Sequence, residues 1–79
     1  MEYSATELIE LADRQGYIVL SVNSSYVEQI AYDLLQRVCV VTINANDYVY
    51  YKVTFHQFYR FANAESKGWF YNYYVRGRW

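Results

Sequence analysis

The chain has 79 residues, of which 54% are hydrophobic and 19% are charged, with a formal net charge of −1. This length leaves room for one hydrophobic core, so we expect a single domain over residues 1–79. The apolar content and balanced charge exclude a disordered or strongly acidic chain, and no apolar run is long enough to span a membrane. With no basic and apolar leader after Met1, we expect a cytoplasmic protein.

A helix is predicted over residues 4–15. Ser4 and Glu7 have the spacing of a capping box, in which each side chain bonds the other residue's backbone N–H. Gly16 is a typical left-handed stop. The alternating, β-rich segment 17–22 then predicts the first strand.

A second helix is predicted over residues 25–37. Ser25 and Glu28 suggest another capping box, and Val27, Ile30 and Leu34 follow at helical spacing. Strands are predicted over 38–43 and 48–53. The turn-forming residues 44–47 between them favour a hairpin.

Residues 54–67 could continue the third strand or form a helix, and the helix is favoured. Thr54 and Gln57 have capping-box spacing, and Lys67-Gly68 is typical of a basic last turn and a stop. A helix is therefore predicted over 55–67 and a final strand over 69–76.

This order predicts an α+β fold. From residue 17 onward it resembles the ferredoxin-like βαββαβ sandwich, a four-stranded antiparallel sheet with two helices on one face, here with an extra N-terminal helix. In that arrangement Val49, Tyr51 and Val53 would face the core, and the alternate residues would form an open face. The N-terminal helix could cover that face, a second copy could stack on it as a homodimer, or another partner could bind it.

Aromatic residues are unusually frequent, with 11 tyrosines, four phenylalanines and two tryptophans. So small a core cannot bury that many phenol rings and satisfy each hydroxyl, so several tyrosines should lie at the surface. Residues 48–79 hold most of the rings and five basic residues against one acidic residue, whereas residues 1–47 hold seven acidic and two basic residues. The composition of residues 48–79 therefore predicts a Tyr-rich, basic binding surface. We expect its partner-binding residues to be Tyr17, Tyr48, Tyr50, Lys52, Phe70, Tyr74, Arg76 and Arg78.

An open sheet with Tyr17, Tyr48 and Tyr50 on central strands resembles an RNA-recognition motif, which implies stacking of single-stranded bases on those rings. Lys52, Arg76 and Arg78 would then contact phosphates. The chain departs from that family at Asn46-Asp47, where a basic residue and a glycine are expected before the aromatic residues. The net charge of −1 also weakens attraction for phosphate, so this interpretation is an alternative.

Catalysis has little support in the sequence. Cys39 is expected to be a buried small hydrophobe, and His56, the only histidine, is expected in a first helical turn. No metal-ligand spacing or glycine-rich phosphate loop is present, so we expect no catalytic residue, metal or cofactor. In size and lack of motifs the chain resembles small inhibitor proteins of phages and mobile elements, such as anti-CRISPR proteins. That resemblance implies a non-enzymatic protein that blocks a surface of a larger partner.

Overall fold

A computed structural model gives the fold, and the structure describes residues 2–24 and 26–79. Its elements in chain order are α1 (Ala5–Gln15), β1 (Ile18–Ser21), β2 (Val27–Asp33), β3 (Val38–Ile43), β4 (Asn46–Tyr50), α2 (Phe55–Ala62), α3 (Lys67–Phe70) and a π-helical turn, η1 (Tyr71–Val75).

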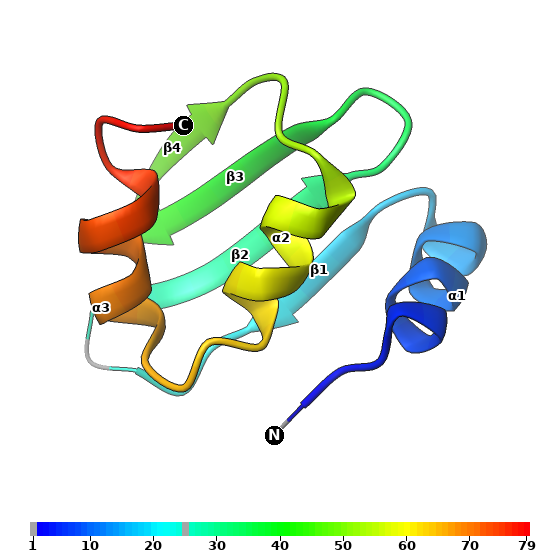
Figure 1. Cartoon of the computed structure of the whole chain (residues 1–79), viewed down its shortest axis with the longest axis horizontal. Coiled ribbons are helices and arrows are strands. Elements are labelled where there is room, and N and C mark those ends of the chain that lie inside the picture. Colours follow the sequence, from blue (N-terminus) through cyan, green and yellow to red (C-terminus); the bar gives the residue numbers. More distant parts are fainter. Residues whose placement is uncertain (1, 25) are drawn as a thin grey trace.

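The four strands form one antiparallel sheet in the order β1-β2-β3-β4. Figure 1 shows α2 and α3 on one face of this sheet, with α1 beside β1 at the opposite end from α3. The predicted α+β class and four-stranded antiparallel sheet are confirmed. The ferredoxin-like order is not found, because the strands follow one another without an intervening helix and the chain ends in helical turns.

The predicted helix over 25–37 is wrong, since residues 27–33 form β2 between β1 and β3. A β-bulge between Val27 and Gln29 explains the misleading pattern. The extra residue lets Val27 and Ile30 both face the core although they are three apart, which imitates helical spacing. Ser25, its predicted cap, lies outside the described residues.

The predicted strand over 69–76 is also wrong, because this segment forms α3 and η1. The Ser66 hydroxyl accepts a hydrogen bond from the Trp69 N–H and starts a new helix. Phe70, Tyr71 and Val75 are buried together, as residues on one helical face are. Aromatic residues are enriched in strands, so the composition of this segment favoured the wrong element.

The two capped helices were predicted with correct starts. Ser4 and Glu7 form a capping box at α1, and Gly16 ends that helix in the left-handed conformation at φ 84°. Thr54 and Gln57 form the same motif at α2. Helix α2 ends at Ala62, however, and Lys67 begins α3 instead of closing the predicted helix 55–67.

The hairpin between β3 and β4 turns at Asn44 and Ala45, whose φ angles are 51° and 64°. Two positive-φ residues are typical of a type I′ turn, which matches the twist of the flanking strands. Strand β4 therefore begins at Asn46, and its Tyr48 pairs with Val41 of β3. The prediction of strand 48–53 began too late and placed Val49 and Tyr51 in the core, but both are exposed.

The core lies between the sheet and the helices. Leu8 joins α1 to it, and Tyr32 stacks on Phe58 of α2 with ring centroids 4.7 Å apart. The buried Tyr32 hydroxyl donates to the Val53 carbonyl over 2.6 Å, so the ring is buried without an unsatisfied polar atom. No helix in the described part of the chain is long and apolar enough to cross a membrane.

Candidate functional site

The face of the sheet away from α2 and α3 carries a row of small aliphatic side chains. Strand pairing aligns Val19 with Ala31, Ala31 with Val40, and Val40 with Val49. Val19 is 37% exposed and Val49 is 46% exposed, at the two ends of the row. Helix α1 does not cover this face, because it packs Leu8 into the core beside β1. We call this surface the open face.

A shallow groove of about 390 Å³ crosses the open face. Tyr17 and Tyr51, which are 52% and 70% exposed, both line it. Ala31, Val38 and Val40 supply its apolar lining. Two phenol rings over an aliphatic surface offer large contact area at little cost in rotamer entropy.

The charges on the open face are acidic. The strand residues that point to this side include Asp33 and Asp47 but no lysine or arginine. Asp33 is half-buried, and its Oδ1 accepts hydrogen bonds from the Leu35 and Gln36 N–H groups. Asp47 accepts one from the Thr42 hydroxyl. A basic group on a partner would be favoured here.

Tyr48 and Tyr50 point to the other side of the sheet, because they pair with the core residues Val41 and Cys39. The Tyr50 hydroxyl shares a hydrogen bond with that of Tyr71. The pKa of Tyr71 is raised mainly by burial and, to a smaller extent, by this hydrogen bond. Tyr48 keeps 44% exposure at the sheet edge, so the structure does not bring either ring to the open face with Tyr17.

A second surface, here called the aromatic–basic surface, lies on α3 and η1. Trp69 and Tyr73 are more than half exposed, and their rings stack with centroids 4.6 Å apart. Tyr74 lies beside them, and the Arg60 guanidinium is 5.5 Å from its ring centroid. Sequence reasoning missed Trp69, Tyr73 and Arg60. The i, i+4 spacing of Trp69 and Tyr73 is the signal that a helical interpretation would have used.

The other predicted site residues are divided between surface and core. Phe70 is buried and stacks on Phe61, so its ring is not at the surface. Arg76 and Arg78 are exposed after η1, close in sequence to the aromatic–basic surface. Lys52 is exposed in the turn between β4 and α2, with φ 59°. The predicted residues therefore do not form a single Tyr-rich, basic surface.

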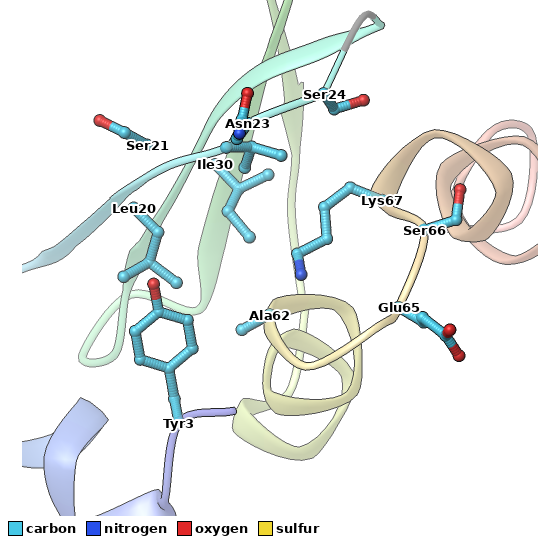
Figure 2. Close-up of a pocket in the computed structure, with 11 residues that line it drawn as sticks. Tyr3, Leu20, Ser21, Asn23, Ser24, Ile30, Ala62, Glu65, Ser66 and Lys67 are labelled. Carbon is cyan, nitrogen blue, oxygen red and sulfur yellow. The ribbon is translucent and has the colours of Figure 1, made fainter. Parts of the chain in front are cut away.

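A third feature is a pocket of about 450 Å³ beside β1, α2 and the start of α3 (Figure 2). Its inner wall contains the side chains of Leu20, Ile30 and Ala62. The Lys67 ammonium extends into it, and the Tyr3 ring stands on the other side. Sequence reasoning treated Lys67 as the end of a helix and so missed it.

The Cys39 thiol is protected from solvent, whereas His56 is exposed near the start of α2. Cys39 is fully buried in β3, and burial raises the pKa of its thiol to about 12, so it is a poor nucleophile at neutral pH. Among residues 2–24 and 26–79, no three His, Cys, Asp or Glu side chains gather closely enough to hold a metal ion.

Comparison with protein families matches residues 23–79, most of the chain, to the KTSC domain. The chain belongs to the KTSC domain family. No curated protein and no solved structure matches it. The KTSC segment runs from the loop before β2 to Trp79, and α1 and β1 precede it.

The three features relate differently to the KTSC segment. The aromatic–basic surface lies entirely within it. The open face and the pocket combine KTSC residues with residues that precede the match, Tyr17 and Val19 on the face and Tyr3 and Leu20 in the pocket. These two sites therefore depend on both parts of the chain.

Proposed function

We propose that this KTSC protein is a non-enzymatic binding protein that contacts a protein partner through its open face. The observation that supports this most directly is the exposed aliphatic row from Val19 to Val49, flanked by Tyr17 and Tyr51. Contiguous apolar surface of this kind is unfavourable in water and marks interaction sites in soluble proteins. Tyrosine is enriched in such interfaces.

The partner should present an apolar segment flanked by lysine or arginine. The open face offers Asp33 and Asp47 and no basic strand residue, so it is complementary to a basic partner. A second copy stacked face to face would bring like charges together at the rim. Nucleic acid would place phosphates near the same carboxylates, which disfavours it here.

The mechanism we propose is steric occlusion. A small domain that covers an apolar surface of a larger protein prevents other molecules from using that surface. This is the inhibitor role implied by the resemblance to small phage and mobile-element proteins, and it requires no chemistry from the domain itself.

The test is retention of a partner by immobilised protein, compared across matched surface variants. Wild type and Tyr73→Glu, which alters the opposite side, should retain the same partner from a host lysate. Val49→Glu should lose it, because a carboxylate then replaces the apolar contact, and thermal unfolding should show that the variant remains folded. Equal retention by Val49→Glu would contradict the proposal. A dimer in light scattering that Val49→Glu returns to monomer would instead identify a second copy as the occupant.

A second candidate function is binding of single-stranded nucleic acid on the aromatic–basic surface. The stacked, exposed Trp69 and Tyr73 rings with Arg60 nearby favour it, because bases stack on such rings and cations contact the phosphates. Titration with oligothymidine should then quench tryptophan fluorescence, weaken steeply with salt, and be reduced by Tyr73→Ala but not by Val49→Ala. Absence of quenching at low salt would remove this candidate.

A further inference from the structure

The pocket in Figure 2 contains a charged group in a partly desolvated position. Lys67 is half-buried, and its ammonium donates a hydrogen bond to the Ala64 carbonyl over 2.7 Å. An ammonium has three N–H donors, and among residues 2–24 and 26–79 the Lys67 ammonium makes this one hydrogen bond. Burial lowers the pKa of Lys67, which reflects the loss of water around its charge. A ligand that accepts from the remaining donors would stabilise it.

The inner end of the pocket is suited to a small amphipathic molecule. The Tyr3 hydroxyl and the Lys67 ammonium both point into it from opposite sides, and the apolar side chains of Leu20, Ile30 and Ala62 lie between them. Glu65 lines the pocket, but its carboxylate points away from the Lys67 ammonium. The polar groups therefore converge on an apolar wall, which is the usual arrangement of a small-ligand site.

The mouth supplies further hydroxyl donors. Ser66 and Ser24 each use the side-chain oxygen to accept a backbone N–H, from Trp69 and Tyr26, both over 3.2 Å. Their own O–H groups are therefore not engaged in those bonds and can be donated outward. These two hydroxyls add donors at the mouth to those that the Lys67 ammonium and the Tyr3 hydroxyl supply inside the pocket, and a ligand that accepts hydrogen bonds could use them.

We propose that this pocket binds a small carboxylate with a short apolar tail, its carboxylate lying between the Lys67 ammonium and the Tyr3 hydroxyl and its tail against Leu20, Ile30 and Ala62. One ammonium matches the single negative charge of a carboxylate. A phosphate carries more charge and would need to be stripped of water against the apolar wall, which is unfavourable. The site is separate from the open face and does not depend on it.

Butyrate is a suitable probe, because it has one carboxylate and a three-carbon tail. Titration of the isotope-labelled full chain, followed by NMR, should give saturable shifts at Ala62 and Lys67. It should also raise the pKa of Lys67, because a bound carboxylate favours the charged amine. Lys67→Met keeps most of the length of the side chain without its charge and should weaken binding about tenfold or more. Tyr3→Phe should weaken it about threefold.

Matched controls separate this site from general attraction. Lys52→Met removes the other lysine, which is exposed in the β4–α2 turn, and should leave butyrate binding unchanged. Propylammonium has the same three-carbon tail with the opposite charge and should not bind. The proposal is overturned if butyrate shifts do not saturate, if folded Lys67→Met and Tyr3→Phe bind it as well as wild type, or if inorganic phosphate binds more tightly than butyrate.

Discussion

Cys39 makes the stability of the protein sensitive to alkaline pH. Its thiol pKa rises from an ordinary 9.0 to about 12 because it is buried, so the folded state resists ionisation that the unfolded state allows. Its contribution is therefore fully present below pH 9 and is lost as pH rises from 9 toward 12. We expect the free energy of unfolding of wild type to fall over this window by up to about 4 kcal/mol more than that of Cys39→Val.

Urea unfolding at several pH values measures this difference. The raised pKa of Tyr71 also reduces stability above pH 10, but it does so in both proteins and cancels in the comparison. The pKa of Tyr32 is raised chiefly by burial and in part by its strand neighbour Cys39, so Cys39→Val also removes that smaller part of the pH dependence. Parallel pH profiles for wild type and Cys39→Val would show that the thiol is not protected by burial.

Tyr32 shows how this small core accommodates a polar ring. Its hydroxyl donates to the Val53 carbonyl, which joins β2 to the segment before α2. Tyr32→Phe keeps the stacking on Phe58 but leaves that carbonyl without this donor, so unfolding should become easier by about 1–2 kcal/mol. Tyr17→Phe, at an exposed ring, should change stability little. Equal effects in chemical denaturation would contradict the assigned role of the buried bond.

At the level of elements, the sequence predicted what local chemistry decides. The capping boxes at Ser4 and Thr54 and the glycine at position 16 gave correct helix boundaries, because those bonds form between near neighbours. The errors occurred where tertiary pairing decides. The bulge at Val27 changed the spacing of core residues in β2, and the aromatic segment after Ser66 became helical because it packs on the sheet.

The prediction of which residues share a binding surface failed for a related reason. Directly opposed residues of an antiparallel pair lie on the same face of the sheet, and β4 pairs Tyr48 with Val41 and Tyr50 with Cys39. Because Val41 and Cys39 face the core, both tyrosines lie on the helical side. The general expectation of exposed tyrosines is confirmed, since Tyr17, Tyr51 and Tyr73 are all more than half exposed. To predict which tyrosines share a surface, the register of β4 against β3 would have been needed.

The turn that sets this register has a residue ill-suited to its conformation. Ala45 has φ 64°, which costs energy for a residue with a Cβ. Ala45→Gly should therefore stabilise the protein by about 0.5–1 kcal/mol. Gly16→Ala is the reverse change at φ 84°, with no atom within 4 Å of the added Cβ, and should destabilise by a similar amount. Thermal unfolding of both variants measures the pair, and a loss of stability in Ala45→Gly would contradict the turn geometry.

On the scale of the whole molecule, the two sides of the sheet differ in chemistry. The open face combines aliphatic groups with carboxylates, whereas the helical side carries Trp69, Tyr73 and Arg60. The acidic N-terminal and basic C-terminal halves of the sequence are thus partly separated in space. This separation allows variants on one side, such as Val49→Glu, to be controlled by variants on the other.

The segment before the KTSC match is part of the same core. Leu8 of α1 is fully buried, together with Ile18 and Leu20 of β1, so α1 should unfold with the KTSC segment as one cooperative unit. Leu8→Ala leaves a cavity and should lower the free energy of unfolding by about 2–5 kcal/mol, a large part of the total for so small a domain. Ile9→Ala, at a side chain that is 41% exposed, should cost much less.

Two signals decide whether that loss is shared by the whole molecule. Both tryptophans, Trp69 and Trp79, lie within the KTSC segment, so their fluorescence reports on that segment, whereas far-ultraviolet circular dichroism also detects α1. In Leu8→Ala the two unfolding midpoints should fall together, because the cavity weakens a core that both parts share. If the fluorescence midpoint kept its wild-type value while helical signal was lost earlier, α1 would be a separately unfolding addition, and the open face and the pocket would lose the rigid support of β1 and Tyr3.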